Sequence, residues 1–249
     1  MHVLVTGANG FVGKNLCVFL SEKENINIIK FTKNNSDKEL LSFVKEADFI
    51  IHLAGVNRPK KNEDFQKGNN EFTKKLCEVV IETEKKIPII FSSSVHAEVD
   101  NDYGNSKLKS EEHLLKLQKK NGNQVFIFRL PNIFGKWSNP NYNSVVATFC
   151  HNIINDLPIQ INDKSAEISL VHIDDVVKSF INLIEKTPQT SEEPYRSVKP
   201  VFKKKVADIA KLINSFKQSR KNYTINRVGA GFERLLYSTY LSYLSPNQF

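Results

Sequence analysis

Tyr103 and Lys107 stand four residues apart, and in this sequence their side chains are the pair best suited to proton transfer. The segment Tyr103-Gly-Asn-Ser-Lys107 is predicted to open a helix, which would put both side chains on one helix face. A free tyrosine has a pKa of about 10, and lowering it by about three units requires roughly 4 kcal/mol. An ammonium beside the phenol contributes by stabilising the phenolate. Such pairs also arise by chance, so this one depends on the elements around it.

A run of three serines closes a predicted strand, Ile87 to Ser94, shortly before this helix. Ser94 is predicted to donate a hydrogen bond to a substrate oxygen, and Ser93 is the alternative for that role. The Tyr–Lys pair follows a glycine turn and a strand that ends in serine. This order of motifs indicates a catalytic site far more specifically than the pair alone. We therefore predict catalytic roles for Ser94, Tyr103 and Lys107.

The first sixteen residues predict a dinucleotide site. The apolar run Val3–Val5 is typical of a buried parallel strand, and apolar residues at helical spacing begin at Phe11. Between them, three glycines are spaced G-x-x-G-x-x-G, which brings backbone N–H groups and a helix N-terminus against a pyrophosphate. The residues predicted to hold the cofactor here are Gly7, Asn9, Gly10, Phe11, Val12 and Gly13.

The second predicted strand, Asn25 to Phe31, bears on the choice of cofactor. Its end should meet the adenosine ribose, where an acidic residue would accept a hydrogen bond from the 2′-hydroxyl of NAD. Lys33 stands there instead, and the next acid is Asp37. A cation suits a 2′-phosphate, so NADPH (NADP) is predicted, and the alternative is that Lys33 is an ordinary loop lysine.

A third predicted strand runs into the small-residue turn of Asp48 to Gly55, where Leu53, Ala54 and Gly55 should run beside the cofactor. His52 is expected to be a packed strand-end residue. Arg58 follows at the carboxyl end of the strand, where ligands bind in open α/β sheets, and is a candidate for a substrate phosphate or sugar.

Strands and helices alternate up to Leu130, which predicts an α/β fold with a doubly wound parallel sheet of the Rossmann type. We assign residues 1–135 to a dinucleotide-binding domain, with residues 162–186 returning to it, and residues 136–249 mainly to a smaller substrate-binding lobe. Other predicted elements are a helix from Asp64 to Lys85, a helix over Val145–Ile154, strands at Ile159–Ile161 and Glu167–Val171, a helix capped by Asp174 or Asp175, a connector from Thr187 to Pro200, and a final helix from Val201 to Lys217.

Composition narrows the class of protein. The chain of 249 residues has a net charge of +8, which indicates either solvated lysines or a basic cleft for phosphorylated ligands. It has no basic-aromatic motif for nucleic acid, no apolar run long enough for a membrane span, and no signal peptide pattern. Three scattered cysteines and unpaired histidines predict reduced thiols, no metal and a cytoplasmic protein.

These motifs resemble those of the extended short-chain dehydrogenase/reductases. The resemblance implies that Lys107 also holds the nicotinamide ribose and that Asn69, in the long predicted helix, takes part in a proton relay. The matching segments are Gly7–Gly13, Asp48–Gly55, Ser92–Ser94, Tyr103–Lys107 and Arg129–Gly135.

A closer resemblance, over essentially the whole chain, is to the capsular-polysaccharide reductases that form UDP-2-acetamido-2,6-dideoxy-L-talose on the route to N-acetyl-L-fucosamine. The distinctive matches are His52–Pro59, Phe134–Trp137, Asn139–Val145, Ala147–Cys150 and Leu236–Leu244. The resemblance implies reduction of the C4 ketone of a UDP-4-keto-6-deoxy-N-acetylhexosamine in a homodimer. Substrate contacts are expected from Arg58, Asn132, Trp137 and Asn143.

Members of that family usually continue into a metal-binding cupin domain credited with epimerisation at C3, and this chain ends at Phe249, about where that domain would begin. The hexose configuration therefore stays open, as does a separate cupin partner. The rivals are an NAD-retaining sugar-nucleotide epimerase or 4,6-dehydratase and a non-catalytic dinucleotide-binding protein. The first two favour an acid near Lys33, and a dehydratase also favours an acidic pair where Val95-His96-Ala97 stands.

Overall fold

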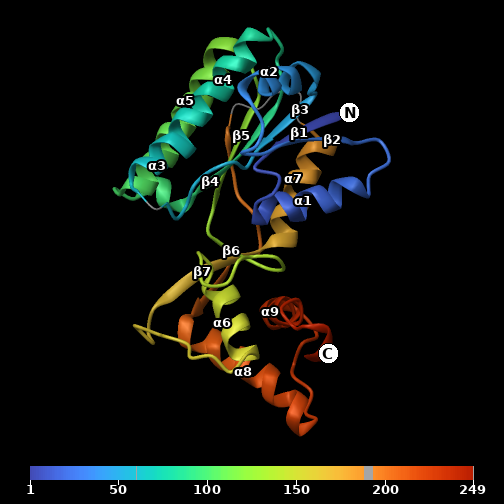
Figure 1. Cartoon of the computed structure of the whole chain (residues 1–249), viewed down its shortest axis with the longest axis vertical. Coiled ribbons are helices and arrows are strands. Elements are labelled where there is room, and N and C mark those ends of the chain that lie inside the picture. The colour runs from blue at the N-terminus through green and yellow to red at the C-terminus, as the bar shows by residue number, and fades with distance from the viewer. Residues whose placement is uncertain (60, 188–192, 249) are drawn as a thin grey trace. The chain divides into compact units, whose positions relative to one another are not determined.

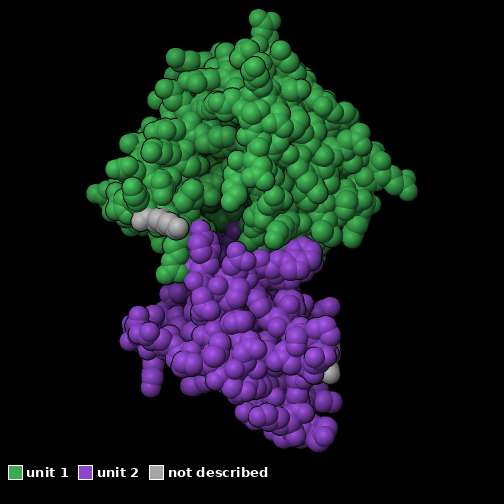
Figure 2. Space-filling model, viewed as in Figure 1, with its two compact units in different colours: residues 1–130, 177–198 green, residues 131–176, 199–249 purple. Residues whose placement is uncertain are grey.

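The computed structural model describes residues 1–59, 61–187 and 193–248. The chain divides into two compact units, which Figure 2 shows in two colours. The first unit comprises residues 1–130 and 177–198, and the second comprises residues 131–176 and 199–249. The chain therefore leaves the first unit at Leu130, at the end of a strand, and returns to it at Val177.

A parallel sheet of six described strands forms the first unit, in the order β2-β1-β3-β4-β5-β8. This confirms the predicted doubly wound sheet. The strand order reverses at β1, which lies between β2 and β3, and cofactors bind at the carboxyl ends of strands at such a point. The strands are β1 (His2–Thr6), β2 (Asn27–Phe31), β3 (Phe49–His52), β4 (Ile89–Ser94), β5 (Val125–Leu130) and β8 (Tyr195–Arg196).

Helices cover both faces of this sheet (Figure 1). On one face, Leu40, Leu76 and Leu114 from three helices share one core cluster with Ile50 and Ile89 of the strands. On the other face, α1 and α7 pack. The helices are α1 (Phe11–Ser21), α2 (Asp37–Glu46), α3 (Glu63–Phe65), the π-helix η1 (Gln66–Glu71), α4 (Phe72–Glu82), the 3₁₀ turn η2 (Val95–Glu98), α5 (Asp102–Asn121) and α7 (Ile173–Glu185), whose first residues belong to the second unit.

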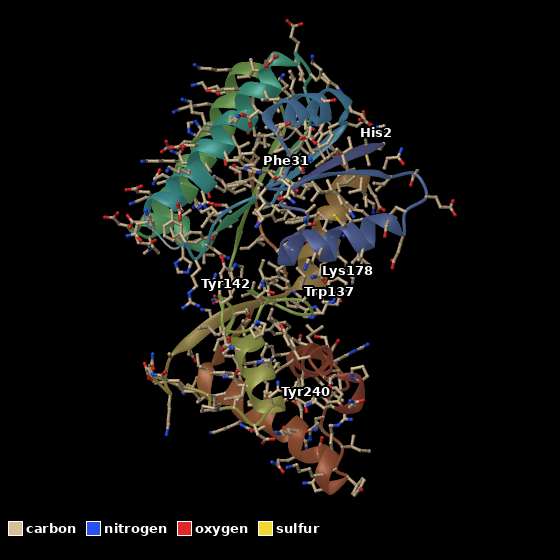
Figure 3. The ribbon with its side chains drawn as sticks, in the orientation of Figure 1. His2, Phe31, Trp137, Tyr142, Lys178 and Tyr240 are labelled. Carbon is tan, nitrogen blue, oxygen red and sulfur yellow. The ribbon has the colours of Figure 1, made fainter. Side chains whose placement is uncertain are left out.

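The second unit holds a small sheet in which β7 pairs parallel with β6 and antiparallel with β9. Its core packs Phe134 and Phe216 with Tyr240, which Figure 3 labels. None of the helices in the described part of the chain has the length and the apolar stretch that a membrane span requires. The elements are β6 (Asn132–Phe134), α6 (Val145–Ile154), β7 (Glu167–His172), β9 (Phe202–Lys205), α8 (Val206–Asn222), α9 (Gly231–Leu241) and η3 (Pro246–Gln248).

Several predicted elements are wrong. Residues 159–161 form no strand, and the helix predicted from Val201 is preceded by β9 and followed by α9. The run Phe-Lys-Lys-Lys alternates half-buried and exposed residues against β7, a period-two pattern that the lysines obscured. The connector predicted from Thr187 contains β8, although residues 188–192 lie outside the described ones.

Two helix predictions also need correction. Asp174 and Asp175 lie in the first turn of α7 and do not cap it, because the helix already begins at Ile173. The helix predicted from Asp64 to Lys85 ends at Glu82 and contains the π-helix η1 near its start. A π-helix is a wide turn that apolar periodicity does not reveal, and it often occurs at functional sites.

Candidate active site

The glycine turn after β1 is shaped to receive an anion. Gly7 has a φ of 70°, and a Cβ on it would stand 2.7 Å from the backbone nitrogen of Ala54. Gly10 is the N-cap residue of α1, and the first turn of α1, described in full, holds no acidic residue. The first N–H groups of the helix have no side-chain cap and no carboxylate in their own turn, which suits a pyrophosphate.

The other residues predicted for this turn surround it. Asn9 is exposed, Phe11 and Val12 are half-buried, and Gly13 is buried in the first helical turn. The turn is tied to the neighbouring strand, since the Gly7 N–H donates to the Phe31 carbonyl at 2.9 Å. These positions fit a bound dinucleotide, whose contacts with them remain a prediction.

Replacing Gly7 by alanine should weaken binding of the nicotinamide dinucleotide by more than about tenfold and lower the free energy of unfolding by about 1–2 kcal/mol or more. Both the left-handed φ and the contact with Ala54 oppose a side chain there. The matched control is Gly231→Ala, which has a φ of 69° but no described atom within 4 Å of the added Cβ. Fluorescence titration with NADPH and urea unfolding measure the two effects. Equal losses in both variants would contradict the assignment.

The turn after β3 brings Gly55 to the middle of the site. The Ala54 N–H donates to the Thr6 hydroxyl at 3.2 Å, which fixes this turn against β1. A Cβ on Gly55 would stand 2.7 Å from Asn69 Oδ1 and 3.3 Å from Lys107 Nζ. The backbone at Gly55 thus approaches two of the predicted catalytic residues, Asn69 and Lys107, more closely than a side chain would allow.

Tyr103 lies in the first turn of α5, where Asn101 caps the helix by accepting the Gly104 N–H at 2.8 Å. Its ring packs against Phe65, with 5.6 Å between the ring centroids. Burial raises the pKa of Tyr103, and a hydrogen bond between the Ser94 and Tyr103 hydroxyls acts in the opposite direction. The phenol is therefore neutral near pH 7 and holds a proton that it can give away.

Lys107 is buried one helical turn further along α5. Its Nζ donates to the Ser92 carbonyl at 2.9 Å and lies 4.8 Å from the centre of the Phe91 ring. Burial lowers the pKa of Lys107 to about 8, and the nearby Glu111 opposes that change. In the described chain the pKa of Tyr103 follows from burial and Ser94, so the predicted lowering by Lys107 is not seen in the protein alone.

Asn69 lies in η1, and its side-chain amide is fully engaged. Its Nδ2 donates to the Val56 carbonyl and to the Ser106 hydroxyl, both at 2.9 Å, and its Oδ1 accepts the Val56 N–H at 2.8 Å. Ser106 in turn donates to the Tyr103 carbonyl at 2.7 Å. Asn69 thus ties the loop after β3 to the helix that carries Tyr103, and its part in a proton relay stays a prediction.

The serines that close β4 differ in their contacts. The Ser94 hydroxyl lies close enough to Tyr103 to lower the pKa of the phenol, whereas the Ser93 hydroxyl donates to the Glu111 carboxylate at 2.5 Å. The structure therefore places Ser94, and not the alternative Ser93, beside the phenol. Sequence reasoning missed Glu111, and its spacing of four residues after Lys107 was the available signal.

The two acids nearest to the end of β2 in the sequence both have partners within the described chain. Lys33 is exposed immediately beyond the strand. Asp37 forms an ion pair with Lys75, and the Glu39 carboxylate caps α2 by accepting from Ser36. Both acids nearest to Lys33 are thus already engaged.

The residues predicted to contact substrate lie in exposed segments of both units. In the first unit, Arg58 is exposed in the loop after β3. In the second, Asn132 is exposed in β6, Trp137 has a φ of 68° and is 47% exposed, and Asn143 is exposed before α6 (Figure 3 labels Trp137). Their contacts with a substrate remain predictions.

His52 joins the cofactor turn to η1. It is fully buried, with Nδ1 2.7 Å from the Thr6 hydroxyl and Nε2 2.9 Å from the Thr73 hydroxyl, and Thr73 donates to the Asn69 carbonyl. Burial lowers the pKa of His52 to about 3, so the imidazole is neutral. The structure places it as a packed residue, in line with the expectation from the sequence.

Comparison with known proteins identifies the family and the fold of the chain. A sequence model of the NAD dependent epimerase/dehydratase family matches residues 3–196. The UDP-2-acetamido-2,6-beta-L-arabino-hexul-4-ose reductase of Pseudomonas aeruginosa (strain ATCC 29260, PA103) is 53% identical over 249 residues. The match covers 100% of this chain and 66% of that reductase, so the chain spans just under two thirds of its relative.

Two solved structures show the same fold. The capsular polysaccharide assembling protein CapF from Staphylococcus aureus is 42% identical with a TM-score of 0.89, over 100% of this chain and 66% of that one. A UDP-glucuronic acid 4-epimerase from Bacillus cereus, in complex with NAD, has a TM-score of 0.83 at 16% identity, over 98% of both chains. The second likeness concerns the fold alone.

Proposed function

Because the chain belongs to the NAD dependent epimerase/dehydratase family, we propose that it reduces the C4 ketone of a UDP-linked 4-keto-6-deoxy-N-acetylhexosamine with NADPH. The observation that carries the proposal is the grouping of Ser94, Tyr103 and Lys107 on β4 and α5 of the unit that holds the glycine turn. The reductase from Pseudomonas aeruginosa, which matches the entire chain, supports the choice of substrate.

The site residues fit a nicotinamide dinucleotide, since the first N–H groups of α1 have no side-chain cap and Gly55 brings the backbone after β3 close to Lys107. When bound, NADPH supplies the hydride that reduces the ketone carbon. Ser94 donates a hydrogen bond to the carbonyl oxygen, and Tyr103 gives its phenolic proton to that oxygen as negative charge develops on it. The Lys107 ammonium binds the nicotinamide ribose and stabilises the resulting phenolate.

This direction of reaction suits the protonation states of the site. A reductase needs Tyr103 as a neutral acid at the start, and burial raises its pKa. It needs Lys107 as a cation, and a pKa of about 8 leaves the side chain mostly protonated at neutral pH. Both residues are thus in the required form in the protein alone.

The proposal extends to a homodimer in the cytoplasm that serves capsule or O-antigen biosynthesis on the route to UDP-N-acetyl-L-fucosamine. Purified protein mixed with NADPH and the UDP-4-keto sugar should lose absorbance at the wavelength of the reduced nicotinamide. Absence of NADPH oxidation would defeat the proposal. Tightly bound NAD recovered from the purified protein would favour an epimerase or dehydratase, and binding without turnover would favour a non-catalytic role.

The choice of NADPH over NADH is tested at Lys33. Lys33→Asp should lower kcat/KM for NADPH by about tenfold, which corresponds to about 1.4 kcal/mol, and should shift the preference toward NADH. The control is Lys38→Asp, an exposed change near the start of α2 that should alter neither value. Steady-state kinetics with both cofactors give the answer, and an unchanged preference in Lys33→Asp would refute the assignment.

A further inference from the structure

Three residues on one face of α5 meet three consecutive serines of β4. Tyr103, Lys107 and Glu111 are spaced by four residues each. The Ser94 hydroxyl lies close enough to Tyr103 to lower the pKa of the phenol, Lys107 donates to the Ser92 carbonyl, and Glu111 accepts from the Ser93 hydroxyl. The contact of Glu111 with Ser93 therefore helps to fix the register in which the other two residues approach the strand.

Glu111 is the anchored member of this row. Its side chain is 1% exposed, and Arg129 of β5 donates to both of its carboxylate oxygens, at 3.0 Å from Nε and 2.6 Å from Nη2. The Arg129 guanidinium lies 4.6 Å from the centre of the Tyr195 ring of β8 and also pairs with Glu98 at 2.6 Å. Arg129 thus supplies the pairing and the hydrogen bonds that a buried carboxylate requires.

We propose that Glu111 is a positioning residue for the reaction, because its carboxylate locks α5 to β4 and places a fixed negative charge one helical turn from Lys107. The inference rests on the proposed reductase function and adds a residue to it. Glu111 acts through Lys107 and Ser93 and is assigned no contact with substrate or cofactor.

The protonation of Lys107 depends on the groups around it. Burial lowers the pKa of Lys107, and Glu111 raises it. Among the titratable groups around this row, His52 on β3 interacts with Lys107, and Arg129 on β5 and Tyr195 on β8 contact Glu111. Glu98 on η2 pairs with Arg129, and the ring of His96 on η2 packs against that of Tyr103. Of these, His52 is neutral over the working range of pH.

The experiment is the pH profile of kcat for the purified chain and for Glu111→Gln, which keeps the shape of the side chain but removes its charge. The alkaline limb, expected near pH 8 from Lys107, should move to lower pH by about 0.5–1 unit, with kcat reduced by about 3–10-fold. Glu98→Gln is the matched control, since Glu98 is an exposed carboxylate on the same arginine. It should leave the limb in place. A limb unmoved in Glu111→Gln would overturn the proposal.

Ser93→Ala is a second variant that tests the positioning role if Glu111→Gln does not fold. It removes one hydrogen bond to the carboxylate and leaves the charge, so kcat should fall by about 3–10-fold while the limb stays. A kcat equal to that of the unmodified chain would overturn the positioning role.

A second readout separates this inference from the proposed function. The rate at which acetic anhydride modifies Lys107, followed by mass spectrometry across pH, reports its protonation without any turnover. A lower midpoint in Glu111→Gln than in the unmodified chain supports the inference, and equal midpoints refute it. Absence of NADPH oxidation by the unmodified chain would count against the reductase function alone.

Discussion

Tyr103→Phe should lower kcat by about 10²–10⁴-fold and leave NADPH affinity close to that of the unmodified chain. The variant keeps the ring that packs against Phe65, so the site should keep its shape. It loses the only group that the account assigns to protonating the developing alkoxide. Steady-state kinetics with the UDP-4-keto sugar measure kcat, and fluorescence titration measures the affinity for NADPH.

The control for this variant is Tyr223→Phe, because Tyr223 is 92% exposed and lies in the second unit. Its kinetics should equal those of the unmodified chain. If Tyr103→Phe kept kcat within about threefold, a different acid would have to donate the proton, and the mechanism would be wrong.

Lys107→Met should lower kcat/KM by about 10²–10³-fold and yet leave stability equal to, or up to about 2 kcal/mol above, that of the unmodified chain. The loss of activity follows from the loss of the cation that stabilises the phenolate and binds the ribose. Stability does not fall because burial already disfavours that cation, although the Ser92 carbonyl loses its donor. For Lys107→Met and the unmodified chain, steady-state kinetics measure kcat/KM and urea unfolding measures stability.

The stability difference between Lys107→Met and the unmodified chain should depend on pH. The pKa of Lys107 is about 8 in the folded chain and 10.5 in the unfolded reference, so the folded state binds the proton more weakly. The cost of burying the charge is fully present below about pH 8 and disappears as the pH rises toward 10.5. The stability advantage of Lys107→Met at pH 7 should therefore shrink at pH 9.5. The exposed Lys109→Met on the same helix should show no such change.

Much of the first unit could be predicted because local pattern and tertiary position agree there. Apolar runs became buried central strands, and the glycine spacing marked a turn that requires a positive φ at Gly7. The resemblance to nucleotide-sugar reductases is confirmed by a relative 53% identical over the whole chain. Long parallel strands carry the strongest sequence signal because both of their faces are buried.

The second unit was harder to predict because short elements there depend on partners distant in the sequence. β9 is a strand since its backbone pairs with β7, more than thirty residues earlier, and its own lysines gave no such indication. In the first unit, the ion pair between Glu111 and Arg129 was missed for the same reason, because it joins a residue of a helix to a residue of a strand. Periodicity reports which face of an element is buried and not which partner meets it.

The most direct test of the central claim is transfer of deuterium from NADPH labelled on the nicotinamide C4 to the sugar. The purified chain should place one deuterium on C4 of the UDP-linked hexosamine, and Tyr103→Phe should slow this transfer severely. NADPH and the UDP-4-keto sugar that both bind without any deuterium reaching C4 would contradict it.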